Sequence, residues 1–410
     1  MSTPNEISGM EKYRWYILTL SSLTAAFVLA IPTMCMPVLF KEISEDLNLS
    51  IFQLGVVWGI VPLAGTFVVL FGGMLSDRFG AKRILVSGCI LTGLAGMLRG
   101  VSDSFTVLTL TMFLYGLLMV ATAPGMLKAL SMWFSDKQFA LANGILAMSM
   151  AIGFMVGSMI SATVLSPLIG GWRNVLFFYG FLGIVVGILW FFSRSAPPRS
   201  DMSSGQKSSI PFKQAISHVL RVKRVWLLAL GLMLQIACVQ GTLGYLPVYL
   251  RDIGWSPVSA DSAVSLFHGA SMIGTVPVAL IATRTGSREK VLFFTTLAMA
   301  IGVGMLAVSG GSLVWVSVLV AGVVRDGFMA VISTAIIQSE GIGSEYAGTA
   351  VGLTQTVSRF GEFLSPPIGN SLGTLNPRYP FIFWSALAAA ALGFFYVLIK
   401  KKAEKLTVRL

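Results

Sequence analysis

Charged residues are scarce in this chain: Asp, Glu, Lys and Arg make up 11% of its 410 residues, whereas a soluble domain carries roughly 25%. An ordinary soluble protein is therefore excluded. Cysteine is rarer still, and Cys35, Cys89 and Cys238 show no metal-binding spacing, so we interpret them as small packing residues. The sequence also lacks a Walker loop, a nucleotide fingerprint and a His/Glu metal cluster. These absences argue against an ATP-driven pump, and we expect no enzyme activity, no cofactor and no metal.

Long apolar runs are abundant instead, and 55% of the residues are hydrophobic. About 20 apolar residues suffice for a helix to cross the hydrocarbon core of a bilayer. The sequence therefore predicts an all-α polytopic membrane protein with 12 transmembrane helices in two pseudo-symmetric six-helix bundles. The spans are expected near 14–40, 52–74, 83–101, 105–127, 139–164, 172–195, 225–250, 262–282, 291–309, 312–337, 347–369 and 379–399. The first run lacks a small-residue cleavage site, so we expect it to remain as a span.

Basic residues give the chain a net charge of +12, and their distribution predicts its orientation. With the N-terminus inside, 21 of the 29 Lys and Arg fall on that side, and five, including Arg99 and Arg251, fall on the opposite side. Lys and Arg resist translocation, so the asymmetry predicts a multi-pass protein of the inner or plasma membrane with both termini in the cytoplasm. This distribution explains the positive charge without a nucleic acid, which we do not expect as a partner.

One long polar stretch separates the sixth and seventh predicted spans. It contains Pro197, Pro198 and a Ser-Gly-rich run, a composition typical of a solvated linker. We therefore expect an N-terminal six-helix bundle over 1–195, a cytoplasmic linker over 196–224 and a C-terminal six-helix bundle over 225–410.

The two halves carry matching small-residue spacings, which indicate an internal repeat. At an offset of 208 residues, the matching pairs are Gly144 and Gly352, Gly153 and Gly361, and Gly157 and Ser365. Small residues at such spacings let helices approach closely in lipid. Parallel six-helix halves of this kind alternate access to a substrate site by rocking against each other.

The loop after the second span carries a compact motif, GMLSDRFGAKR. Its defining residues are Gly73, Asp77, Arg78, Gly80, Lys82 and Arg83. A degenerate copy follows the eighth span, where Arg284, Gly286 and Arg288 correspond to Arg78, Gly80 and Lys82. In a chain with twelve spans, this motif resembles the loop signature of the major facilitator superfamily, and the resemblance covers the whole chain.

The resemblance implies that this loop acts in conformational gating, with Asp77 bracing the positive end of the eleventh span near Tyr346 to Gly348. Two positions depart from the family's patterns. Met112 stands where proton-linked members have an arginine, and Ser158 stands where drug/proton antiporters have a proline. The stretch over 124–144 is loosely similar to the organic-anion and nitrate-type branches of the family.

Four ionisable residues lie inside the apolar tenth and eleventh spans, namely Arg325, Asp326, Arg359 and Glu362. A charge at bilayer depth costs at least ~2.5–3.5 kcal/mol, so such residues usually face partners, water or a substrate. Arg359 and Glu362 share one helix face and are expected to pair within their span. Arg325 and Asp326 diverge by about 100°, which predicts that they cannot both face one ligand and that they pair across to the eleventh span.

Two interpretations of these four residues remain open: a static ion-pair network, or a site for an anion and a proton. In the second, an arginine binds the anion through its planar fork of donors, and we favour Arg325 over Arg359. Asp326 or Glu362 then takes up a proton. His268 in the eighth span is a further candidate proton carrier because histidine titrates near neutrality, and a packing role is its alternative.

Three polar residues elsewhere extend the predicted substrate site. Lys128, late in the fourth span, adds positive charge to the cavity or instead snorkels to the interface. Gln240 and Tyr245 in the seventh span offer donors and acceptors, although such residues also serve as helix contacts and interfacial anchors.

The sequence thus predicts a monomeric secondary active transporter that moves a small anion, a mono- or dicarboxylate, by proton symport with alternating access. Its predicted partners are this anion, the proton and the lipid bilayer. A proton-coupled exporter of drugs or amphiphiles and a non-transporting membrane sensor of the same fold remain as alternatives.

Overall fold

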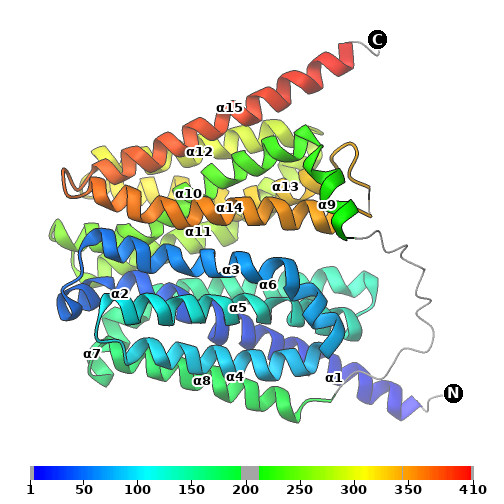
Figure 1. Cartoon of the computed structure of the whole chain (residues 1–410), viewed down its shortest axis with the longest axis horizontal. Coiled ribbons are helices and arrows are strands. Elements are labelled where there is room, and N and C mark those ends of the chain that lie inside the picture. The colour runs from blue at the N-terminus through cyan, green and yellow to red at the C-terminus, as the bar shows by residue number, and fades with distance from the viewer. Residues whose placement is uncertain (1–3, 195–211, 344, 408–410) are drawn as a thin grey trace. The chain divides into compact units, whose positions relative to one another are not determined.

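The structure is a computed structural model that describes the backbone of residues 4–194, 212–343 and 345–407. Side chains are described for 12–68, 80–135, 138–194, 213–343, 345–402 and 404. Within these ranges the chain forms helices joined by short turns, with no β-strand (Figure 1). The all-α prediction is confirmed.

The helices before the linker include two π-helical segments, η1 and η2. Their bounds are α1 (Pro4–Leu23), η1 (Thr24–Ala30), α2 (Ile31–Leu47), α3 (Ile51–Phe79), α4 (Ala81–Gly100), α5 (Phe105–Trp133), α6 (Asp136–Ile160), η2 (Ser161–Leu165), α7 (Ser166–Ile169) and α8 (Trp172–Phe192). The remaining helices are α9 (Phe212–Leu220), α10 (Lys223–Asp252), α11 (Pro257–Arg284), α12 (Arg288–Val308), α13 (Leu313–Ile337), α14 (Ala347–Leu372) and α15 (Tyr379–Thr407).

Eleven helical stretches among the described residues are long and apolar enough to cross a membrane. The remaining predicted span, 347–369, coincides with α14, a helix of 26 residues. At 1.5 Å per residue α14 is about 39 Å long, which exceeds the hydrocarbon thickness of roughly 30 Å. It falls outside the eleven because Arg359, Glu362 and several amides and hydroxyls reduce its hydropathy. The polarity of α14 is the first indication that it contributes more than packing.

The chain divides into two compact units, of which the first comprises Met1–Leu49 and Ala64–Ser200. Within it, α4 packs against α5 and α8, and α6 packs against η1 and α2. The π-helical segment η1 interrupts the first predicted span, which the sequence did not indicate. Pro32 follows η1 and has no N–H to donate to the Val28 carbonyl, which instead accepts a hydrogen bond from the Tyr115 hydroxyl at 3.3 Å.

The second unit comprises Ser50–Leu63 and Asp201–Leu410. Its helices pack in the pairs α11 with α13, α10 with α14, and α12 with α15 (Figure 1). The short helix α9 lies within the predicted linker and packs against α10 and α14. Its His218 ring stacks on Tyr346 with centroids 4.2 Å apart, and a ring nitrogen lies 2.7 Å from the Gly341 carbonyl oxygen.

One pair of the repeated small residues, Gly153 and Gly361, occupies equivalent helix contacts in the two units. A side-chain carbon at Gly153 would lie 2.7 Å from the Ala30 Cβ, so the fifth span closely approaches the first. A side-chain carbon at Gly361 would lie 2.7 Å from Met233, so the eleventh span closely approaches the seventh. The close helix approach predicted from the repeated small residues is confirmed at Gly153 and Gly361, whereas a side-chain carbon at Gly144 would meet no atom within 4 Å.

Candidate functional site

Arg325 and Asp326 form an ion pair on α13 inside the second unit. The Arg325 Nη1 atom donates to the Asp326 Oδ1 atom at 2.6 Å, and the two side chains are 23% and 27% exposed. The sequence predicted pairing across to the eleventh span, but this ion pair joins the two adjacent residues to each other. Their Cα–Cβ bonds do diverge around the helix, but the long arginine side chain curves back along the helix surface and reaches its neighbour's carboxylate.

Helix α11 supplies two polar side chains to this pair. The Ser271 hydroxyl accepts a hydrogen bond from the Asp326 backbone N–H at 3.1 Å. His268, one turn earlier on α11, is buried and interacts electrostatically with both Arg325 and Asp326. The predicted proton carriers His268 and Asp326 are therefore neighbours in the structure.

Arg359 on α14 has no carboxylate within 4.0 Å among the described residues, so its predicted ion pair with Glu362 is not formed. Its Nη1 atom instead makes a long contact of 3.5 Å with the Pro62 carbonyl oxygen on α3. Its Nε atom is buried and has no hydrogen-bond partner in the described part of the chain. The arginine reaches a neighbouring helix, and its cation keeps unused donor capacity.

Glu362 lies one turn beyond Arg359 on the same face of α14. Its Oε1 atom accepts a long hydrogen bond of 3.5 Å from the Ser358 hydroxyl. The charges of Arg359 and Arg325 both act on this carboxylate. We refer to these ionisable residues of α11, α13 and α14, namely His268, Arg325, Asp326, Arg359 and Glu362, as the charged cluster.

The predicted contacts on α10 lie in a largely packed environment. Tyr245 is buried, and its hydroxyl donates to the Pro377 carbonyl at 3.2 Å. Its ring packs against Phe381 and Trp384. Gln240 is half-buried, and its backbone carbonyl accepts a hydrogen bond from the Trp58 indole N–H at 2.8 Å. These contacts fix the position of α10 against α3 and α15.

The remaining predicted site residues belong to the first unit. Lys128 is half-buried on α5. Gly80, Lys82 and Arg83 line a cavity at the start of α4. Three predicted loop residues, Gly73, Asp77 and Arg78, lie among the residues whose side chains are outside the described part.

Arg99 is a buried cation that the sequence reasoning missed, because it was counted among the residues outside the membrane. It is 0% exposed on α4, and its Nη1 atom donates to the Pro32 carbonyl at 2.9 Å. Its guanidinium lies 3.9 Å from the centroid of the Tyr115 ring, a cation–π contact. Its position near the end of an apolar run was the only available signal, and that signal does not distinguish burial from exposure.

Arg251 was also counted as an outside residue, and the structure buries it. Its Nη2 atom donates to the Asp261 Oδ1 atom at 2.6 Å, with the side chains 9% and 0% exposed. The pair joins α10 to α11 within the second unit. It neutralises both charges, so it differs from Arg359 in leaving no cation for a ligand.

Comparison with known proteins identifies a family model and several similar proteins. Residues 22–366 match the family model described as Major Facilitator Superfamily. The chain is 28% identical over 324 residues to the "Probable nitrate/nitrite antiporter NarK1" of Thermus thermophilus, covering 76% of this chain and 70% of that protein. It is 24% identical over 425 aligned residues to the "4-hydroxybenzoate transporter PcaK" of Pseudomonas aeruginosa, covering 95% and 93%.

Among solved structures, a bacterial homolog of the human lysosomal transporter Spinster in an inward-facing, unoccupied conformation has the same fold. Its TM-score against this chain is 0.77 at 17% sequence identity, with 97% of each chain covered.

Proposed function

This chain belongs to the major facilitator superfamily and is a secondary transporter rather than an enzyme; on that premise, we propose that it carries a small anion by proton symport. The substrates named for its two relatives, nitrate or nitrite and 4-hydroxybenzoate, are small anions. We propose a mono- or dicarboxylate as the substrate class, an alternating-access cycle, and an orientation with both termini in the cytoplasm.

One observation carries the proposal: Arg359 is a cation on a transmembrane helix with no carboxylate within 4.0 Å among the described residues. Its buried Nε atom also has no hydrogen-bond partner there. A guanidinium offers a planar fork of donors that matches a carboxylate or nitrate. We therefore assign the substrate anion to Arg359 in place of Arg325, which Asp326 already engages.

The charge balance of the cluster supports coupling to a proton. In the empty state, the Glu362 carboxylate offsets the Arg359 cation, and Arg325 offsets Asp326. When a singly charged anion binds Arg359, a proton on Glu362 restores neutrality, so the loaded site carries no net charge; a dicarboxylate requires a second proton, for which His268 offers a site. A neutral site avoids the cost of moving a bare charge through the membrane. The proton leaves Glu362 when the anion leaves Arg359, so both move in the same direction.

The other members of the cluster have supporting roles in this proposal. Asp326 accepts a 2.6 Å hydrogen bond from the Arg325 guanidinium. The positive charge of Arg325 in turn stabilises the charged form of Glu362. His268 interacts with both members of the pair and offers a further ionisable group for the proton. Gln240 stays as a proposed lining residue of the substrate site, and the Tyr245 ring contributes to the wall of that site.

The test is uptake by purified protein in liposomes whose interior is alkaline. Labelled 4-hydroxybenzoate, other small carboxylates, nitrate and the cationic dye ethidium are compared. We expect anion accumulation that disappears when the pH gradient is collapsed. Proton-driven movement of ethidium without anion uptake would replace the proposal with a drug exporter. No flux of any solute would favour a non-transporting sensor.

Glu362→Gln is expected to abolish anion accumulation driven by a pH gradient while preserving exchange of labelled for unlabelled substrate. The amide has nearly the same shape as the carboxyl group but cannot take up a proton. The measurement is gradient-driven uptake beside counterflow in the same liposomes. Glu45→Gln, which alters an exposed carboxylate on α2, should retain both activities. A Glu362→Gln protein with normal gradient-driven uptake would remove this residue from the coupling step.

A further inference from the structure

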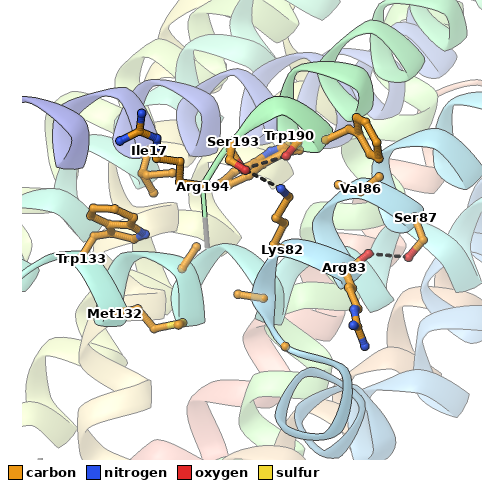
Figure 2. A pocket seen from close by; sticks show the side chains of 14 residues that line it. Ile17, Lys82, Arg83, Val86, Ser87, Met132, Trp133, Trp190, Ser193 and Arg194 are labelled. Atoms are coloured by element: carbon orange, nitrogen blue, oxygen red, sulfur yellow. Dashed lines mark hydrogen bonds between the residues drawn. The ribbon is translucent and has the colours of Figure 1, made fainter. Parts of the chain in front are cut away.

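A cavity of about 540 Å³ opens in the first unit, where α4 begins and α5 and α8 end (Figure 2). Its wall combines cations with aromatic rings, and no carboxylate lines it among the residues whose side chains are described. The residues used below are Lys82, Arg83, Arg194, Met132, Trp133 and Phe191. This cavity belongs to a different unit from the charged cluster and has no part in the proposed transport chemistry.

The three cations at the cavity are not ion-paired with any described side chain. Lys82 Nζ donates to the Ser193 carbonyl, which places its ammonium group inside the cavity (Figure 2). Arg83 and Arg194 are exposed. The N-terminus of α4 faces the same region, and its N-cap residue Gly80 provides no side-chain cap. The described side chains therefore give the cavity an excess of positive charge, which suits an anionic group.

The position of the cavity along the helices indicates the source of that anion. The membrane-spanning stretches begin at residue 81 in α4 and end at residue 133 in α5 and at residue 192 in α8. Next to the cations, Met132, Phe191 and Phe192 have exposed fractions of 37%, 62% and 73%. Trp133 lies at the same level, where tryptophan is enriched at membrane–water interfaces. A cationic cavity with an exposed apolar rim at the end of three spans fits a lipid better than a soluble ion.

We propose that this cavity binds the headgroup of an anionic phospholipid. The phosphate lies between Lys82, Arg83 and Arg194, and the acyl chains run along the exposed side chains of Met132 and Phe191. Basic side chains near a membrane surface attract acidic lipids by about 1 kcal/mol each, which corresponds to roughly fivefold in affinity per cation.

The test uses the full chain, delipidated in detergent and titrated with phosphatidylglycerol or phosphatidylcholine, with bound lipid counted by native mass spectrometry. The variant Lys82→Gln/Arg83→Gln/Arg194→Gln should bind phosphatidylglycerol roughly 100-fold more weakly. The matched control is Arg284→Gln/Arg288→Gln/Lys290→Gln, which removes the same charge from the repeat-related loop of the second unit and should bind like the wild type.

The proposal would be overturned if both triple variants lost phosphatidylglycerol affinity equally, or if neither lost any. Either result would show that the cavity contributes nothing specific to lipid binding. If the first variant does not fold, Arg194→Gln alone should weaken binding about fivefold, because this exposed residue lies beyond the end of α8. Competition distinguishes the source of the anion. Inorganic phosphate or glycerol phosphate that displaces the lipid at equal concentration would show an anion site without lipid preference and would contradict the proposal.

Discussion

Arg359→Ala is expected to weaken substrate binding strongly while leaving the protein folded in detergent. The substitution removes the guanidinium that we assign to the anion and leaves no ion-pair partner stranded within 4.0 Å among the described residues. Truncating one member of a desolvated charge pair costs about 2–5 kcal/mol, so affinity should fall roughly 30-fold to several-thousand-fold. Arg359→Lys should lose less substrate affinity than Arg359→Ala, because lysine keeps the positive charge although it lacks the planar fork of guanidinium donors. Affinity is measured by substrate-induced thermal shift and by calorimetry.

Two companion variants decide between the arginines. Arg284→Gln changes an exposed arginine at the end of α11 and should retain wild-type affinity. Arg325→Ala leaves Asp326 without its 2.6 Å partner and should lower stability more than affinity. The opposite pattern, with normal binding by Arg359→Ala and lost binding by Arg325→Ala, would return the anion to Arg325.

Asp261→Asn is expected to destabilise the second unit strongly. Arg251 and Asp261 form a nearly fully buried pair at 2.6 Å, and the substitution leaves a buried guanidinium without its counter-charge. Breaking such a pair costs ~3–5 kcal/mol, which corresponds to a fall in Tm on the order of 10 °C for a unit of this size. The measurement is thermal unfolding of the purified protein followed by a thiol-reactive dye or by intrinsic fluorescence.

The matched control for this prediction is Asp46→Asn. Asp46 also pairs with an arginine, Arg173, but the two side chains are 43% and 37% exposed. Exposed pairs contribute ~0–1 kcal/mol, so Tm should change by a few degrees at most. Replacing both buried partners, as Arg251→Met with Asp261→Leu, should recover much of the lost stability. Equal Tm values for Asp261→Asn and Asp46→Asn would show that burial of the first pair has no energetic consequence.

The helical membrane architecture could be predicted from the sequence because it depends mainly on local properties of each span. A membrane span must satisfy its own backbone hydrogen bonds and be apolar over about 20 residues, and both requirements appear directly in the run lengths. The repeat glycines were equally informative. Gly153 and Gly361 must approach another helix whatever surrounds them, and the structure places each against a neighbouring span.

The side-chain contacts of the candidate site could be predicted less well from the sequence. The depth of Arg359 and its spacing from Glu362 follow from the sequence, whereas the turn of its guanidinium toward the Pro62 carbonyl does not. A long side chain can reach several neighbouring helices, and the choice depends on tertiary packing. The same reason explains Arg99, whose burial against Pro32 and Tyr115 depends on helices remote in sequence. The turn of Arg325 toward Asp326 depends on a rotamer, which residue spacing does not determine.

The most direct test of the central claim is the pH inside protein-containing liposomes, recorded with a trapped fluorescent dye while a substrate anion is added outside without a preset gradient. The cluster of Arg359 and Glu362 predicts that anion entry acidifies the interior at a fixed ratio of protons to anions, and that Arg359→Ala and Glu362→Gln liposomes show no acidification. Anion uptake at full rate with an unchanged internal pH would contradict the account.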